Sequence, residues 1–208
     1  LLNVGDFLHC NTPNVTAAGT SLDSSGHWID SVESAVRIYR QTVEWALELN
    51  QKVTLLNTRG NHDEDLSMVI NSMLTVFFED QPRVTVLSNV SKFMVYQYHQ
   101  VLLTSHHGDK GIKHQRIYEY FTRNHAKLWG DTTARYCHLG HIHHKQQSEV
   151  GGAMLFESWN SLAAVDEYHH QAGYGSGRSM SAVIYDPVWG EVQRFRVGIT
   201  QLYDEAAA

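Results

Sequence analysis

Four short segments of this chain combine histidine with aspartate, asparagine or a further histidine beside a glycine. Such oxygen and imidazole ligands bind borderline divalent metals, and glycine allows the sharp turns that bring ligands together. One segment of this kind would be weak support for a metal site, whereas four in order favour a metal-dependent hydrolase. The segments are Gly5-Asp6-Phe7-Leu8-His9, Gly60-Asn61-His62-Asp63, His106-His107-Gly108-Asp109 and Gly140-His141-Ile142-His143-His144.

Within these segments, each residue type also has an ordinary structural reading. Asp6 could bridge two cations or simply cap a turn. Asn61 offers a carbonyl oxygen, and its neighbour His62 must point elsewhere, so one would hold metal while the other faces substrate; a plain turn explains the pair equally well. His141 and His143 are two residues apart, so an extended segment would place both side chains on one face. In a chain with 14 histidines, chance remains an alternative for this pair.

Most of the other histidines are not expected to belong to the site. Only one of His106 and His107 can point at a given centre, and we favour His107 because it directly precedes Gly108. His144 should face away from the pair before it, and His27 is left undecided. Structural roles are expected for the others, which are His99, His114, His125, His138, His169 and His170.

The elements that must position these residues follow from hydrophobic periodicity. Helices are expected over 30–49, 64–78 and 112–128, with Asp30 or Ser31 capping the first. Strands are expected over 1–5, 52–58, 84–88, 92–97, 100–104, 134–139, 152–156, 181–186 and 190–197. This order predicts an α/β fold whose later strands build a second, more antiparallel sheet. The four segments follow strands, so their side chains can converge on one rim.

Composition and charge bear on the size of the domain, its binding partners and its cellular compartment. The 208 residues suffice for one large domain, and no stretch is apolar enough to span a membrane. The net charge of -6 weighs against broad nucleic-acid binding without excluding a small basic groove. Cys10 and Cys137 are expected to be free thiols in a reducing compartment, and no signal peptide is visible, so we expect a cytoplasmic protein. The long polar loops over 10–29 and 157–180 are expected to shape substrate access.

The set of motifs resembles that of the calcineurin-like metallophosphoesterase superfamily over residues 5–143. The family pattern runs Asp-x-His, Gly-Asp-x-x-(Asp or His), Gly-Asn-His-(Asp or Glu), a His before Gly, and Gly-His-x-His. The resemblance implies a four-layer α/β/β/α sandwich of two mixed sheets flanked by helices. It also implies two divalent metal ions, with Mn the first choice and Fe, Zn or Ni the alternatives.

By the same resemblance, Asp6 is the bridging carboxylate, and Asn61, His107 and His141 bind one metal. His143 binds the other metal. His62 is the catalytic histidine that does not bind metal, and His9 orients it or contacts the substrate phosphate. The implied reaction is phosphoester hydrolysis by a metal-bound hydroxide.

Two departures from the family pattern bear on activity. The Asp-x-His element is absent; it would lie before Leu1, and we expect an N-terminal truncation of a single domain over 1–203, followed by a tail over 204–208. In the phosphoprotein phosphatases, Asp often stands where this chain has His9, and an Arg that clamps phosphate follows; no such Arg follows His9.

A second resemblance concerns substrate class. His9, Asn11 and Pro13 are similar to the corresponding segment of double-strand-break-repair nucleases, and Gly173, Tyr174 and Arg178 resemble phage and prophage phosphoesterases. We therefore expect a phosphodiesterase or nuclease acting on a phosphoester, nucleic acid or nucleotide, with no membrane partner. The alternatives are a phosphomonoesterase acting on nucleotides or small phosphates, and a metal-binding scaffold with impaired catalysis. The sequence does not specify the oligomeric state.

Overall fold

The computed structural model describes residues 1–21, 27–162 and 177–201. The chain divides into two compact units, of which unit 1 comprises Leu1–Met94 with Ser105–Asp109 and unit 2 comprises Val95–Thr104 with Lys110–Ala208. Among the described residues, no helix has both the length and the apolar character needed to cross a membrane.

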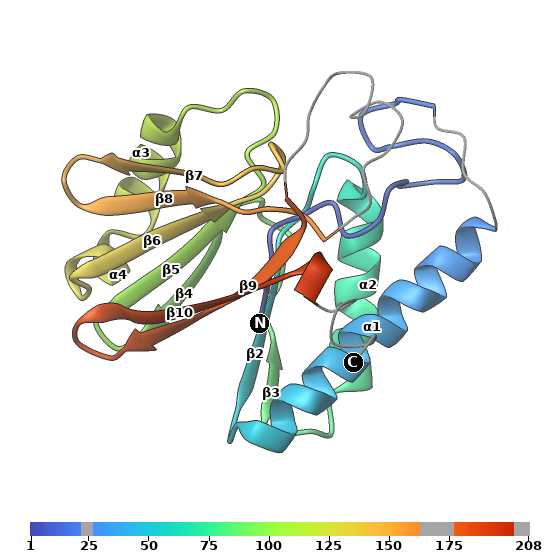
Figure 1. The fold of residues 1–208 in the computed structure, drawn as a ribbon, viewed down its shortest axis with the longest axis horizontal. Helices are drawn as coiled ribbons and strands as arrows, with labels where there is room; N and C mark the ends of the chain where they lie inside the picture. Colours follow the sequence, from blue (N-terminus) through green and yellow to red (C-terminus); the bar gives the residue numbers. More distant parts are fainter. Residues whose placement is uncertain (22–26, 163–176, 202–208) are drawn as a thin grey trace. The chain divides into compact units, whose positions relative to one another are not determined.

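Unit 1 is built on a parallel sheet of three strands in the order β1-β2-β3, with helices α1 and α2 packed on it (Figure 1). Leu2 pairs with Leu56 and Val53 pairs with Val84, so the carboxyl ends of β1 and β2 lie side by side. The elements are β1 (Leu2–Asn3), α1 (Trp28–Leu49), β2 (Val53–Asn57), α2 (Glu64–Phe77) and β3 (Val84–Val86).

The core of unit 1 forms where the two helices meet β2. Each helix has an apolar face at a spacing of three or four residues, as an amphipathic helix requires. The buried positions of the helices are Val32, Ala35, Tyr39 and Val43 on α1, and Leu66, Ile70 and Leu74 on α2. The cap predicted for α1 is wrong, because the helix begins at Trp28 after His27, so that Asp30 and Ser31 lie inside its first turn.

Unit 2 contains most of a five-stranded mixed sheet in the order β4-β5-β6-β8-β7 and a separate two-stranded antiparallel hairpin (Figure 1). Strands β6 and β8 are parallel, whereas β7 and β8 are antiparallel. The strands of the sheet are β4 (Met94–Tyr98), β5 (Val101–His106), β6 (Ala134–Leu139), β7 (Gln146–Val150) and β8 (Met154–Ser158). The remaining elements are α3 (His114–Asn124), α4 (Ala126–Gly130), β9 (Ser179–Asp186) and β10 (Gly190–Gly198).

The predicted fold class is confirmed: the chain is mixed α/β, with two main sheets accompanied by helices. Two predicted details are wrong. The helix expected over 112–128 is two helices that meet at His125, and β7 was not expected at all. Both cysteines are free, as expected, and the structure buries both of them.

Some expectations remain predictions. The single domain over 1–203 is one of them. Others fall outside the described residues, namely the tail over 204–208, most of the access loop over 157–180, and His169, His170, Gly173 and Tyr174.

Candidate metal centre

The turn after β1 directs the Asp6 carboxylate toward the turn after β2. Gly5 and Asp6 both have positive φ, of 97° and 54°, which makes the chain reverse immediately after the strand. Asp6 Oδ1 accepts a hydrogen bond from the His62 N–H at 2.8 Å, and Asp6 Oδ2 lies 2.9 Å from His107 Nε2. The carboxylate therefore joins two of the predicted motifs directly.

Two glycines make this close approach possible. A Cβ on Gly60 would lie 2.7 Å from the Asp6 carboxyl carbon and closer still to Oδ1 and the backbone nitrogen of Asp6. A Cβ on Gly5 would lie 2.9 Å from Cγ of the His107 ring and 3.0 Å from the Cα of Gly60. Any larger residue at either position would have to displace a predicted ligand.

His107 is held in an orientation that suits a metal ligand. Its side chain is 1% exposed, and its Nδ1 lies 2.8 Å from the Val4 carbonyl oxygen. A carbonyl can only accept, so Nδ1 carries a proton and Nε2 faces Asp6 and the Asn61 Oδ1 at 3.0 Å. A ligating histidine commonly has its other ring nitrogen fixed by a carbonyl in this way.

The electrostatics of the pair agree with this geometry. Burial by itself would lower the pKa of His107, but the hydrogen bond and charge of Asp6 outweigh burial and raise it. For Asp6, burial would raise the pKa, but His107 and the His62 N–H outweigh burial and lower it. Each group thus favours the charged form of the other, and His107 Nε2 lies beside two oxygen atoms, in a position suited to a cation.

These three side chains fit a divalent metal ion. Asp6 supplies an anionic oxygen, Asn61 a neutral oxygen and His107 an imidazole nitrogen, a mixed set that suits Mn, Fe, Zn or Ni. All three residues belong to unit 1, and the oxygens of Asp6 and Asn61 both lie against His107 Nε2. The candidate metal centre is defined by Asp6, Asn61 and His107.

His106 has a different role from its neighbour. It is buried, its Nδ1 accepts the Gly108 N–H at 2.9 Å, and its ring lies 4.7 Å from that of Phe93. Burial lowers the pKa of His106 to about 4, so it is neutral near pH 7. Of the two histidines, His107, which the sequence favoured, is the one that contacts Asp6 and Asn61.

His62 lies beside the candidate metal centre and is fixed by His9. Its Nδ1 is 3.1 Å from the His9 carbonyl oxygen, so Nδ1 carries the proton. The two rings stack, with centroids 5.2 Å apart and planes inclined by 23°. His62 Nε2 lies 4.0 Å from Asp6 Oδ2. The arrangement leaves Nε2 as the ring nitrogen nearest the carboxylate.

Two contacts near the centre were not foreseen from sequence. Asp63 is buried, and its Oδ2 accepts the Leu8 N–H at 3.0 Å; burial raises the pKa of this carboxyl to about 6. Lys92 Nζ lies 2.8 Å from Glu64 Oε2 and 3.4 Å from Asp109 Oδ2. It thereby ties the turn that carries Asn61 to the turn that carries His107.

His141 and His143 belong to unit 2, in the segment that follows β6. Both have positive φ, of 64° and 53°, and the Ile142 N–H donates to the Gly140 carbonyl at 2.8 Å. The expectation that this pair lies on an extended segment is therefore wrong, because the backbone turns at each histidine.

The histidines assigned structural roles include one with a well-defined network in unit 2. His138 is buried, its Nδ1 accepts the Trp159 Nε1–H at 3.1 Å, and its Nε2 lies 3.1 Å from the Tyr185 hydroxyl. Burial lowers the pKa of His138 to about 4. His114 contacts Ser148 Oγ at 2.7 Å, His99 occupies the turn between β4 and β5, and His125 lies between α3 and α4.

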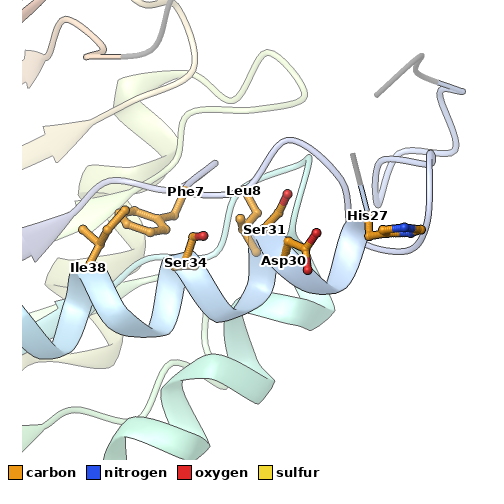
Figure 2. Close-up of a pocket in the computed structure, with 8 residues that line it drawn as sticks. Phe7, Leu8, His27, Asp30, Ser31, Ser34 and Ile38 are labelled. Atoms are coloured by element: carbon orange, nitrogen blue, oxygen red, sulfur yellow. The ribbon is translucent and has the colours of Figure 1, made fainter. Parts of the chain in front are cut away.

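His27 lines an open groove on unit 1, along the first turns of α1 (Figure 2). The groove has a volume of about 390 Å³. Its apolar wall comes from Phe7, Leu8, Ala35 and Ile38, and its polar groups from His27, Asp30, Ser31 and Ser34. It lies beside the Phe7-Leu8 part of the segment that joins Asp6 to His9, on the side that faces α1.

A scan against protein-family models and a search of curated proteins found no match to this chain. Among solved structures, a single-mutant Vps29 from Entamoeba histolytica matches with a TM-score of 0.40 and 16% identity, over 77% of this chain and 76% of that chain. Wild-type Vps29 from the same organism, complexed with Zn²⁺, matches with a TM-score of 0.39 and 13% identity, over 78% and 88%. Both identities are too low to transfer the role of any residue.

Proposed function

We propose that this chain is a metal-dependent phosphoester hydrolase, and more narrowly a phosphodiesterase or nuclease. The observation that carries the proposal is the convergence of Asp6 and Asn61 on His107 Nε2, with His62 Nε2 4.0 Å from the same Asp6 carboxylate. Metal-assisted hydrolysis needs a set of metal ligands and, next to it, a histidine that does not bind the metal. The ordered motifs of the metallophosphoesterase superfamily support the same reaction class.

In this proposal, Asp6, Asn61 and His107 hold one divalent cation. From the sequence pattern, His141 completes that position and His143 serves a second cation, with Mn as the first choice for both. Bound cations would supply charge stabilisation to the phosphoryl oxygens and make a water molecule more acidic.

His62 provides the proton chemistry. Because its Nδ1–H is committed to the His9 carbonyl, protonation at Nε2 makes this atom the donor to a leaving oxygen or to a phosphoryl oxygen. His9 acts through His62, holding the ring by the carbonyl contact and by stacking. The substrate is a phosphodiester, including nucleic acid, and the free thiols of Cys10 and Cys137 support the expected cytoplasmic setting.

The test compares hydrolysis of bis(p-nitrophenyl) phosphate, in the presence of Mn²⁺, by the wild-type chain and three variants. His62→Ala should retain bound metal and lose about 10²- to 10⁴-fold in kcat, the usual effect of removing acid–base help. His107→Ala should lose metal as well as activity. His144→Ala is the matched control, because His144 is exposed, its Nδ1 lies 2.8 Å from the nearby Ile142 carbonyl oxygen, and it has no role in the proposed site.

The outcomes separate the rival functions. Faster turnover of p-nitrophenyl phosphate than of the diester would replace the diesterase with a phosphomonoesterase. Metal binding with no hydrolysis of either substrate would leave a metal-binding scaffold and reject the enzymatic proposal. Unchanged turnover in His62→Ala would reject the role given to that residue.

A further inference from the structure

The segment from Leu8 to Ala18 wraps around the turn that carries Asn61 and His62. The His9 carbonyl contacts His62 Nδ1 at 3.1 Å on one side of this turn. On the other side, the Ala17 N–H donates to the His62 carbonyl at 2.9 Å, and the Ala18 N–H donates to the Asn61 carbonyl at 3.1 Å. The position of His62 therefore depends on where this wrapping segment is anchored.

One anchor, beside the hydrogen bond from the Leu8 N–H to Asp63, is Asn11, which caps helix α2 from outside the helix. The residue in the ordinary capping position, Asp63, makes no side-chain cap hydrogen bond. Instead, Asn11 Oδ1 accepts the N–H groups of Asp65 at 2.9 Å and Leu66 at 3.0 Å. Helix N-termini leave such N–H groups without partners inside the helix, and a side-chain oxygen that accepts them stabilises the end.

A third hydrogen bond makes the contact specific for an amide. Asn11 Nδ2 donates to Asp65 Oδ2 at 3.0 Å, so one side chain both accepts from the backbone and donates to the carboxylate. A carboxylate at position 11 would accept the two N–H groups but would meet the Asp65 carboxylate with like charge. An alanine would lose all three hydrogen bonds.

We propose that Asn11 is a positioning residue for His62. Asn11 fixes the wrapping segment to the start of α2, and through that segment it fixes the His9 carbonyl that holds the His62 ring with its proton on Nδ1. The inference rests on the proposed function for its effect on turnover, but the orientation of the ring does not depend on that function. Because Asn11 acts through His9 and His62, its loss should reduce proton donation more than substrate or metal binding.

The variants are chosen to separate positioning from simple stabilisation. Asn11→Ala removes the three hydrogen bonds. The double variant Asn11→Asp with Asp65→Asn exchanges amide and carboxylate, so it can restore all three without changing the net charge. Asn50→Ala is the matched control, because Asn50 also bonds a helix end, donating from Nδ2 to the Ala46 carbonyl at 2.8 Å at the end of α1.

Turnover is measured on two phosphodiesters that differ in leaving group, bis(p-nitrophenyl) phosphate and diphenyl phosphate. Phenolate is a poorer leaving group than p-nitrophenolate, so its departure depends more on protonation. Loss of His62 positioning should therefore lower kcat more for diphenyl phosphate. We expect Asn11→Ala to lower kcat on diphenyl phosphate about 10-fold or more, since small displacements of a reacting group are costly. KM and Mn²⁺ affinity should change less than about twofold, because uniform binding is retained. The double variant should recover, and Asn50→Ala should match the wild type.

A readout independent of catalysis is the tautomer of His62, followed by ¹⁵N NMR of the imidazole. The wild type, the double variant and Asn50→Ala should hold the proton on Nδ1, whereas Asn11→Ala should show a mixture of tautomers. If the wild type hydrolyses neither ester, the proposed function fails, but the tautomer still decides the role of Asn11. An unchanged tautomer in Asn11→Ala, or equal losses of kcat on both esters that the double variant does not reverse, would overturn the inference.

Discussion

Gly60→Ala tests most directly whether close approach at the turn after β2 holds the candidate metal centre together. The added Cβ would lie 2.7 Å from the Asp6 carboxyl carbon, and the backbone nitrogen of Asp6 is closer still. Rotating the Asp6 side chain cannot relieve the contact with that nitrogen, so the chain at β1 or at the turn has to move. The carboxylate then moves away from the His62 N–H and from His107 Nε2.

The magnitude follows from two contributions. Forcing an extra carbon into a filled space costs about 1–3 kcal/mol. Loss of the hydrogen bond between the His62 N–H and the Asp6 carboxylate adds about 1.5–3 kcal/mol, the range for a bond to a charged group. We therefore expect Gly60→Ala to lose about 2.5–6 kcal/mol of unfolding free energy, which for a chain of this size lowers Tm by about 5–24 °C.

The assay is thermal unfolding with and without Mn²⁺, accompanied by direct titration of the metal. At a Mn²⁺ concentration about 100 times Kd, a ligand that binds only the folded state adds about 2.7 kcal/mol of stability. The wild type should show this increase, and Gly60→Ala should show little of it. Gly130→Ala is the control, because nothing among the described residues lies within 4 Å of a Cβ placed there. Wild-type Tm and metal affinity in Gly60→Ala would refute the reasoning.

Two further predictions concern unit 2. His138 has its pKa lowered from 6.5 to about 4, so the unfolded chain binds a proton that the folded protein does not, and stability falls by about 3 kcal/mol as pH drops through that range. His138→Asn, which keeps an acceptor for Trp159, should flatten part of this loss in acid unfolding curves, and an identical slope would contradict it. His106, His114 and His125 should contribute to the loss that remains, because burial lowers the pKa of each. Glu157 is 3% exposed and forms a bidentate pair with Arg194, so Glu157→Gln should cost about 3 kcal/mol in chemical denaturation. Glu33→Gln, in the exposed pair with Arg37, should change stability little, and equal losses in the two variants would reject the distinction.

Sequence periodicity predicted the elements that bury an apolar face. The pattern Val32, Ala35, Tyr39 and Val43 locates α1 because its spacing matches a helical turn. Strand β7, in contrast, consists of Gln146–Val150 and is largely exposed, so it has no alternation of apolar residues to detect. It forms because β8 offers it a hydrogen-bonding edge, and that edge becomes visible only in the folded sheet.

The candidate metal centre, like the fold, could be predicted only in part from the sequence. Asp6, Asn61 and His107 were expected as ligands from the family resemblance, and the structure brings them together in unit 1. The orientation of the His107 ring depends on the Val4 carbonyl, and the position of Asn11 depends on the start of α2. The two members of each of these contacts lie tens of residues apart along the chain, so no local sequence pattern predicts them.

The five residues Ser105–Asp109 give unit 1 a discontinuous chain. A fragment that stops at Met94 would contain Asp6 and Asn61 but not the ring on which they converge. The contact from Asn61 to His107 spans 46 residues and that from Val4 to His107 spans 103, so two large loops must close before the ligands meet. During synthesis, Asp6 and Asn61 are made well before His107. If this position binds a metal ion as proposed, binding requires that the chain has been made through β4 and β5 as far as His107.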